Sequence, residues 1–418
     1  MDADRVIADL KELAELTGGP DGARRVCWTD EWVKARELVR SKLEELPVEI
    51  TTDAAGNVWA DLPGEQEGFV IVGSHVDSVP AGGWLDGALG IFVALEALRA
   101  HADEERPVGL RFVDWADEEG ARFGRSLFGS SACAGTLDVD EVRDLKDREG
   151  ERLEDVVARY DVDLAKVHES GAQREGARAY LELHIEQGPV LESRGEPAAA
   201  VLGTVGVERR AVVFTGRAAH AGATPMDMRQ DSFLAAARAA LDIREIGLAH
   251  EGGYCTTGGA TSDPGVVTAV AGRTELLLDQ RHLDAAELAA MLKEADEACE
   301  RAAEAFGCTV ELKHLWAIPP IPFDDRLIGF AKEAVVAAGG KDTAIPSGPL
   351  HDAAEMARLI PTVMLFSQSS PPVSHTREED TKEEDLRVAI EAYGQTVDST
   401  LREAADGDLP PFTASDRG

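Results

Sequence analysis

The segment GSHVDSVPAGGWLDGALG, residues 73–90, lies between two stretches that predict regular structure. It follows FVIV, a short apolar run typical of a buried parallel strand, and its last residues begin the helical pattern ALGIFVALEALRA. His75 and Asp77 therefore emerge at the carboxyl end of the strand, and Asp86 follows in a glycine-rich loop. Ligands of open α/β sheets bind at that edge, and imidazole and carboxylate groups bind metal ions. Taken alone, the segment indicates either a metal site or an ordinary polar turn.

The size and composition of the chain predict a two-domain cytoplasmic protein. Its 418 residues suit two domains, and 44% hydrophobic residues suffice for a large core. No apolar run approaches the roughly 20 residues of a membrane span. The first residues predict an acidic amphipathic helix rather than a signal peptide. The five cysteines are scattered, odd in number and without a CxxC pair, which is typical of reduced thiols.

The formal net charge of −36 is extreme and is spread over the whole chain. Such a surface repels nucleic acids and anionic membranes, so neither is an expected partner. Concentrated salt screens self-repulsion of this size. A halophilic source is therefore our hypothesis.

The order of the predicted elements divides the chain into residues 1–207, 208–320 and 321–418. The first and last parts follow an α/β pattern, whereas the middle part follows the order β-α-β-β-α-β of a ferredoxin-like sandwich. Within the middle part, the third element is expected at the apolar run GVVTAV. In the first part, the stretch from SACAGTL to about Gly176 is expected to be helical and exposed.

Several candidate ligands lie at the predicted ends of strands. Three histidines and three acids suffice for two divalent ions if one carboxylate bridges them. Successive side chains that leave a strand point in different directions, so one member of a Glu-Glu pair can bind metal while the other acts as a base. An acidic dipeptide is more often a solvated loop, and a lone histidine is more often a core residue. The candidates are His75, Asp77, Asp86, Glu118, Glu119, His184 and His375.

The chain resembles the hydantoinase/carbamoylase family of co-catalytic zinc amidohydrolases and peptidases over nearly its whole length. The resemblance rests on seven motifs in order: GSHVDS, GGWLDGALG, DEEGARFG, ELHIEQGPVLE, HAGATPMDMRQD, SGPLHDA and SHTREED. It implies a zinc-peptidase-like catalytic domain with a mixed, mostly parallel sheet. It also implies an inserted ferredoxin-like domain that mediates dimerisation and acts as a lid.

The resemblance also implies a role for each candidate ligand. One divalent metal would be held by His75, Asp86 and His184, and a second by Asp86, Glu119 and His375, with Asp86 as the bridge. Asp77 would orient His75 through a hydrogen bond. Glu118 would be the general base. The ligand set does not choose among Zn, Mn, Co and Ni, although Zn is the expected ion.

Further residues are assigned by the resemblance alone. His220 matches a histidine that reaches the active site of the partner subunit and steadies the oxyanion. Arg209 and Arg281 match residues that bind the substrate carboxylate. Further matches to substrate contacts are Gln187, Ser347 and Gly348. Three departures leave the substrate open: Thr268 replaces a usual Asn, Ala271 replaces a usual Pro, and GPLHDA replaces GAGHDA.

The sequence thus predicts a homodimeric metal-dependent amidohydrolase that cleaves the linear C–N amide of a small N-carbamoyl-L-amino acid or ureido acid. An allantoate amidohydrolase is the nearest alternative. A metallo-peptidase or N-acyl amino acid deacylase is more distant, because those relatives place a carboxylate where His184 stands. A degenerate, non-enzymatic binding protein is disfavoured by the complete ligand set.

Overall fold

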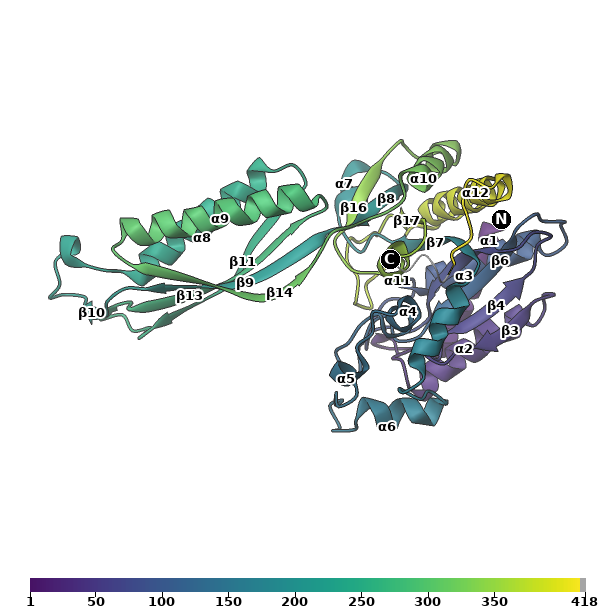
Figure 1. Ribbon diagram of the computed structural model, residues 1–418, viewed down its shortest axis with the longest axis horizontal. Helices are drawn as coiled ribbons and strands as arrows, with labels where there is room; N and C mark the ends of the chain where they lie inside the picture. The colour runs from purple at the N-terminus through teal and green to yellow at the C-terminus, as the bar shows by residue number, and fades with distance from the viewer. Residues whose placement is uncertain (414–418) are drawn as a thin grey trace. The chain divides into compact units, whose positions relative to one another are not determined.

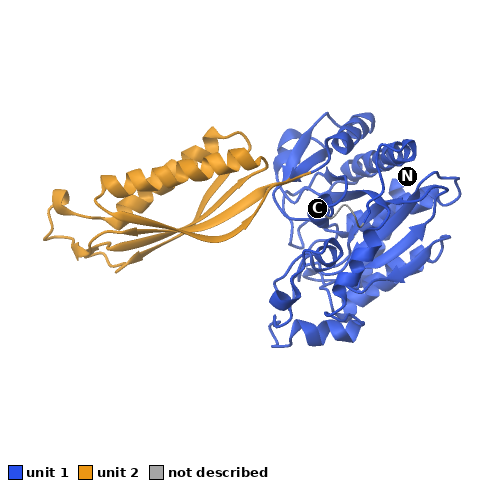
Figure 2. Cartoon of the chain, in the orientation of Figure 1, with its two compact units in different colours: residues 1–203, 323–418 blue, residues 204–322 orange. Residues whose placement is uncertain are grey.

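The computed structural model describes residues 1–413, which form two compact units (Figure 2). Unit 1 contains Met1–Gly203 and the chain from Phe323 onward, and unit 2 is the intervening Thr204–Pro322. The inserted segment expected from the sequence, residues 208–320, lies inside unit 2. Within the described residues, no helix is both long and apolar enough to cross a membrane.

Unit 1 is built on a mixed sheet whose central strands are parallel. The strands are β3 (Glu49–Thr52), β4 (Val58–Leu62), β5 (Phe69–His75), β6 (Gly109–Trp115), β7 (Ala177–Ile185), β8 (Ala198–Thr204), β16 (Ala344–Ser347) and β17 (Thr362–Ser367). The order is β8-β17-β7-β5-β6-β4-β3, with β16 beside β8 (Figure 1). Strands β17, β7, β5 and β6 pair in parallel. At the two sides of this group, β8 is antiparallel to β17, β4 is antiparallel to β6, and β3 is antiparallel to β4. This arrangement confirms the predicted α/β class.

Helices cover the sheet of unit 1. They are α1 (Ala3–Thr17), α2 (Asp30–Leu43), α3 (Ala88–His101), α7 (Val190–Arg194), α10 (Asp325–Ala337), α11 (Asp352–Ala357) and α12 (Glu383–Asp406). Helix α3 is buried on all sides from Ala88 to Leu98, because it packs between the sheet and helices α1 and α12. Every residue of β7 is also buried, as expected for a parallel strand covered on both faces.

The segment between β6 and β7 corrects one expectation. It forms short helices rather than an exposed helical stretch: α4 (Phe128–Ala134), α5 (Val139–Val142), α6 (Leu153–Val157), η1 (Ala158–Tyr160) and η2 (Val167–Arg174). All seven residues of α4 are buried, because this helix packs against β6, α11 and η2. The small residues of SACAG allow that close packing. The many charged residues that follow them in the sequence favour an exposed segment, which is why burial of α4 is not expected from composition.

Unit 2 has the element order β-α-β-β-α-β. The elements are β9 (Gly206–Thr215), α8 (Ser232–Ala249), β11 (Tyr254–Asp263), β13 (Arg273–His282), α9 (Ala285–Ala305) and β14 (Thr309–Ile318). The antiparallel sheet has the order β11-β13-β9-β14, which is that of a ferredoxin-like sandwich. Its core joins apolar residues of β9 and β13, such as Phe214 and Leu278, to the small-residue faces of α8 and α9.

One strand of unit 2 lies elsewhere than expected. The predicted strand GVVTAV is a loop apart from its last two residues, which form the short β12 (Ala269–Val270). The strand beside β13 is instead β11, whose sequence YCTTGGATSD has little apolar character. Strand β11 is at the edge of the sheet and is bulged between Thr257 and Gly259, so few of its side chains need to be apolar. The remaining short strands are β1 (Gly18–Gly19), β2 (Gly22–Ala23), β10 (Ala219–His220) and β15 (Ile321–Pro322).

Candidate metal centre and active site

The parallel strands of unit 1 bring distant residues to one edge of the sheet. His75 is the last residue of β5 and pairs in register with Trp115, the last residue of β6. Glu118 follows shortly after β6, and His184 lies next to the end of β7. His375 follows β17 in a loop. The carboxyl ends of adjacent parallel strands share an edge, so this convergence follows from the topology.

The first ligand group consists of His75, Asp86 and His184, whose ligand atoms all lie within 4.8 Å of one another. Asp86 Oδ1 is 3.7 Å from His75 Nε2 and 3.2 Å from His184 Nε2. All three side chains are buried. Gly87 makes this packing feasible, because a Cβ there would lie 2.4 Å from the His75 ring and its φ is +65°.

The second ligand group consists of Asp86, Glu119 and His375, which satisfy the same 4.8 Å limit. His375 Nε2 lies 3.5 Å from Asp86 Oδ2 and 3.4 Å from Glu119 Oε2. The two groups therefore use different oxygens of one carboxylate. His375 is half-exposed, so this group opens toward solvent, while the first group is enclosed.

These spacings suit a divalent cation. Tetrahedral coordination with bonds of about 2.0–2.1 Å places neighbouring ligand atoms about 3.3–3.4 Å apart. Among residues 1–413, no group forms a hydrogen bond with the buried Nε2 of His75, as expected for a ligand nitrogen. His184 Nδ1 lies 2.9 Å from the Ile185 carbonyl, which directs the ring's other nitrogen toward Asp86. The donor set therefore fits a metal.

The electrostatics of the cluster also favour positive charge. Burial lowers the pKa of His75, but the neighbouring carboxylates, Glu118 foremost, outweigh it and raise that pKa well above its ordinary value. The pKa of His184 is likewise raised against burial, chiefly by Asp86. A site that draws protons onto buried imidazoles attracts cations in general.

Asp77 links His75 to the Glu118–Glu119 pair. Its Oδ1 lies 3.5 Å from His75 Nδ1, and its backbone oxygen lies 3.2 Å from the same nitrogen. The amides of Glu118 and Glu119 donate to its two carboxylate oxygens, each at 3.3 Å. The preceding Asp117 has a φ of +57°, so this tight connection redirects the chain immediately after β6.

Glu118 is placed to act on a group near the metal ligands. Its Oε2 lies 3.7 Å from His75 Nε2, and the residue is only 7% exposed. Burial raises its pKa well above the ordinary value, although positive charge on His75 opposes the shift. A carboxylate with a raised pKa is a stronger base, so it can accept a proton from water and return it.

Three residues contact Asp86 from outside the ligand groups. Gln187, expected to contact substrate, places its amide nitrogen 2.7 Å from Asp86 Oδ2. Ser374 Oγ donates to the same oxygen at 2.8 Å. Glu379 accepts from the Asp86 amide at 3.0 Å. Sequence reasoning did not single out Ser374 or Glu379, although both belong to the motif SHTREED.

The segment SGPLHDA also reaches the site. Ser347 ends β16, and its hydroxyl donates to the Pro349 carbonyl at 2.9 Å; Gly348 follows it. The ring of His351 lies 4.4 Å from that of His184 between centroids. Burial lowers the pKa of His351 well below its ordinary value, so its imidazole is neutral. The motif gives no sign in the sequence that the His351 ring lies beside that of His184.

Arg25 is a buried cation that the sequence did not reveal. It is 0% exposed, and its Nε donates to the Val76 carbonyl at 2.8 Å. Burial lowers its pKa, and the negative charges of Glu379 and Asp86 oppose that effect. An arginine in the loop GARRVCW is indistinguishable by pattern from a solvated one, so only the fold discloses its position.

The other predicted substrate residues belong to unit 2. Arg209 and Arg281 lie on β9 and β13 and both bind Asp279, with Nε–oxygen distances of 3.0 and 2.6 Å. Burial opposes ionisation of Asp279, yet the two guanidinium groups, Arg281 foremost, lower its pKa. Arg209 also lies 4.9 Å from the centre of the Trp316 ring. Asp279 therefore holds the two guanidinium groups together in one cluster.

His220 and Thr268 lie together at a separate two-stranded sheet of unit 2, which is formed by β10 and β12. Strand β10 pairs with β12, with His220 opposite Ala269, and the Ala221 amide donates to the Thr268 carbonyl at 2.9 Å. The amides of Gly222 and Ala223 both donate to His220 Nδ1 at 3.1 Å. Because Nδ1 accepts, the proton of the neutral ring is on Nε2. His220 thus presents an N–H donor to solvent.

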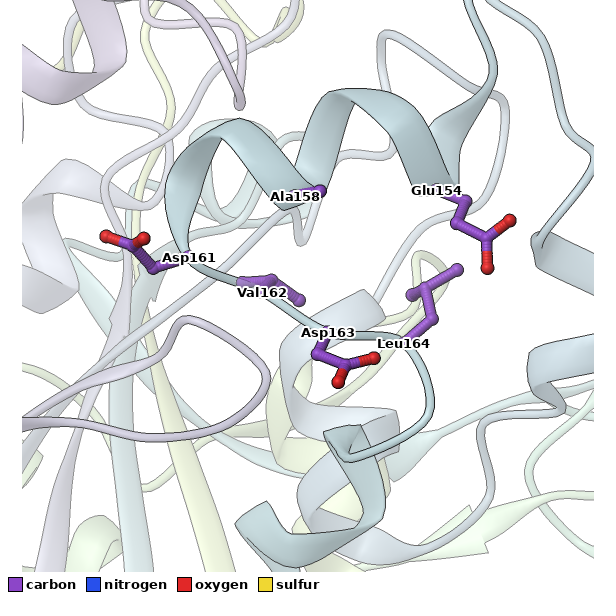
Figure 3. A pocket seen from close by; sticks show the side chains of 6 residues that line it. All are labelled: Glu154, Ala158, Asp161, Val162, Asp163 and Leu164. Carbon is purple, nitrogen blue, oxygen red and sulfur yellow. The ribbon is translucent and has the colours of Figure 1, made fainter.

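A separate cavity of about 300 Å³ lies beside α6 and η1 (Figure 3). Its lining comprises Glu154, Ala158, Asp161, Val162, Asp163 and Leu164. Three of these are acidic and three are aliphatic, so the lining lacks the nitrogen ligands present at the strand ends. We assign no chemistry to it.

Comparisons with known proteins agree with this geometry. Residues 71–399 match the model of peptidase family M20/M25/M40. The chain is 33% identical over 405 residues to an N-carbamoyl-L-amino acid amidohydrolase of Geobacillus stearothermophilus, covering 94% of this chain and 97% of that protein. It is 30% identical to an allantoate amidohydrolase of Bacillus subtilis, covering 92% and 94%. The crystal structure of a hydantoinase/carbamoylase family amidase from Burkholderia multivorans superposes with a TM-score of 0.84 at 30% identity, covering 96% and 98%.

Proposed function

Because the chain belongs to peptidase family M20/M25/M40, we propose that it is a metal-dependent amidohydrolase acting on N-carbamoyl-L-amino acids or related ureido acids. The observation that supports this most directly is the pair of ligand groups that share Asp86, with Glu118 beside them. The likeness to carbamoyl and ureido hydrolases over more than nine-tenths of the chain supports the substrate class.

The proposed reaction divides its work among the residues of unit 1. Two divalent cations, held by the two ligand groups, would supply polarisation of a water and of the substrate carbonyl. Glu118 accepts the proton of the attacking water and then passes it to the leaving nitrogen. Asp77 holds His75 and the Glu118 backbone in place. For an N-carbamoyl amino acid, one water converts the substrate into the free amino acid, ammonia and carbon dioxide.

The arginine cluster of unit 2 supports recognition of a carboxylate. Arg209 and Arg281 already bind the carboxylate of Asp279, which fixes their planar groups. A guanidinium fork matches a substrate carboxylate with two parallel hydrogen bonds. The N–H of His220 suits the carbonyl oxygen of the scissile group, because a neutral donor stabilises negative charge as it develops.

A homodimer is part of the proposal. Leu234, Leu241 and Leu248 recur every seven residues on α8 and are 38%, 64% and 65% exposed. This spacing aligns them on one face of the helix, and an exposed apolar stripe of this kind marks an interaction surface. Strand β11 is an edge strand and offers a backbone ladder to a second copy.

The nearest alternative substrate is allantoate, which the matched Bacillus subtilis relative acts on by name. Thr268, which stands where an Asn is usual, is a reason to retain allantoate as an alternative substrate. A shorter hydroxyl side chain beside His220 changes the contacts available to the substrate carbonyl, whichever ureido group is bound.

The test is a metal-reconstituted assay. Purified protein is stripped with a chelator, reloaded with Zn, Mn, Co or Ni, and assayed for ammonia release from several N-carbamoyl-L-amino acids and from allantoate. We expect release from at least one carbamoyl substrate, dependent on metal. Absence of turnover with every metal and substrate would defeat the proposal. The cytoplasmic location stays a prediction.

A further inference from the structure

The carboxylate of Asp86 must hold a particular rotation to serve both ligand groups. Its Oδ1 faces His184 at 3.2 Å, and its Oδ2 faces His375 at 3.5 Å. The terminal torsion of an aspartate has a broad energy profile, so the side chain alone does not select this rotation. Hydrogen bonds from the surroundings have to select it.

Three residues outside the ligand groups contact Asp86: Gln187, whose amide nitrogen lies 2.7 Å from Oδ2, and Ser374 and Glu379, which share one loop. The Ser374 hydroxyl lies 2.8 Å from Asp86 Oδ2 and 2.6 Å from Glu379 Oε2. Glu379 Oε1 accepts from the backbone amides of Leu85 and Asp86, at 3.2 and 3.0 Å. Glu379 is 1% exposed. Glu379 therefore holds the backbone of Asp86, while the single hydroxyl hydrogen of Ser374 serves one of the two carboxylates that it contacts.

The same loop also carries a ligand. Ser374 immediately precedes His375, and Glu379 follows it by four residues. Trp84 Nε1 donates to Asp380 Oδ1 at 3.1 Å, which adds a second tie between this loop and the Asp86 loop. The position of His375 relative to Asp86 thus depends on these contacts.

Gly83 shows how closely the two loops are fitted. A Cβ at this position would lie 2.0 Å from Glu379 Oε1 and 2.5 Å from Glu379 Cβ. Only glycine permits the buried carboxylate to approach the Leu85 and Asp86 amides so closely. The requirement is steric, which provides a way to move Glu379 without altering any polar group.

We propose that Ser374 and Glu379 are positioning residues that orient Asp86 and thereby set the affinity of the second ligand group for its cation. This inference rests on the proposed function, because it assumes that the second group binds a metal. Neither residue belongs to a ligand group. Partners of this kind outside the coordination sphere typically change metal affinity by about 10–100-fold.

The experiment measures metal binding by the full chain. Metal-free protein is titrated with Co²⁺ in competition with a chromophoric chelator, and the visible absorption of bound Co²⁺ reports the coordination of each equivalent. We expect wild type to bind two equivalents. Ser374→Ala and Gly83→Ala should retain the first equivalent and weaken the second by about tenfold or more.

Two variants serve as matched controls. Ser367→Ala removes a buried hydroxyl of strand β17 that makes no hydrogen bond within the described part of the chain. Gly329→Ala adds a Cβ into open space on α10. Both should bind the two equivalents as wild type does. Glu379→Gln keeps an oxygen for the two backbone amides, so it should weaken the second equivalent less than Glu379→Ala does.

The proposal is overturned if Ser374→Ala and Gly83→Ala bind the second Co²⁺ within about threefold of wild type. If Ser374→Ala does not fold, as judged by circular dichroism of the metal-free chain, Gly83→Ala and Glu379→Ala decide by the same criterion. An assay of ammonia release distinguishes a failure of this inference from a failure of the proposed function. An active wild type with unchanged variants defeats only this inference, whereas an inactive wild type defeats the proposed function.

Discussion

Mixing two inactive variants, His220→Ala and Glu118→Gln, should restore about one quarter of wild-type activity. Random pairing of equal amounts makes half of the dimers mixed. If each site combines unit 1 of one chain with His220 of the other, a mixed dimer has one intact site and one site with both mutations. Across all dimers in the mixture, one active site in four is therefore expected to be intact.

The geometry of unit 2 explains why the donor should come from the partner. Val207 pairs with Arg281 at one end of β9, and Thr215 pairs with Arg273 at the other end. These eight steps span about 27 Å at 3.4 Å per residue. His220 lies beyond the Thr215 end, whereas Arg281 lies at the opposite end. A carbamoyl amino acid, comparable to two extended residues or about 7 Å, cannot touch both in one chain.

The assay is ammonia release after the variants are unfolded, mixed and refolded together, with heterodimers verified by mass spectrometry. A mixture of Glu118→Gln and His75→Ala is the control. Both of these mutations lie in unit 1, so no pairing assembles a complete site and no activity should return. Verified His220→Ala/Glu118→Gln heterodimers that stay inactive would refute the shared site.

Four further predictions follow from named features. Glu118→Gln should lower kcat by about 10²–10⁴ while metal binding persists, because Glu118 is outside both ligand groups; activity within tenfold of wild type would remove it as the base. Leu241→Glu should convert the dimer into monomers in analytical ultracentrifugation, because it places a charge in the exposed stripe of α8; an unchanged sedimentation coefficient would count against that interface. Burial and Asp77 raise the pKa of Asp117 from 3.8 to about 8. The contribution of its protonated form to stability is therefore complete below about pH 4 and is lost as the pH rises to about 8. The melting temperature of Asp117→Asn should exceed that of wild type by an increasing margin from about pH 5 to about pH 8. A net charge of −36 predicts that the urea midpoint rises between about 0.1 and 1 M NaCl, and a flat dependence would argue against salt adaptation.

The elements that carry the ligands were predictable because each has a strong local signal. The apolar run before His75 reads as a parallel strand, and the structure confirms the α/β class with parallel central strands. The family suggested by the motifs is confirmed by the match over residues 71–399. The role of each site residue stays a prediction, although the structure brings His75, Asp86 and His184 together as expected.

The failures have physical causes. Strand β11 escaped notice because an edge strand with a bulge needs few apolar side chains, whereas GVVTAV has them without pairing along its length. Helix α4 was expected to be exposed because charged residues follow it, yet its own small residues are buried. Arg25 and Glu379 could not be found at all, because each acquires its role from a partner more than 50 residues away.

The buried carboxylates of unit 1 differ in how their charge is compensated, and that difference indicates which one can move a proton. An ionised carboxylate is costly to bury unless donors surround it. Asp77 accepts from two backbone amides, and Glu379 also accepts from two. Glu182 accepts from Ser74, Tyr180 and the Ala353 amide. Among residues 1–413, no comparable set of donors reaches the carboxylate of Glu118, which has His75 Nε2 at 3.7 Å as its nearest cationic partner. Fixed donors would hold the charge on the oxygen and oppose protonation, so the carboxylate with the fewest of them is the one best able to accept a proton from water and release it again.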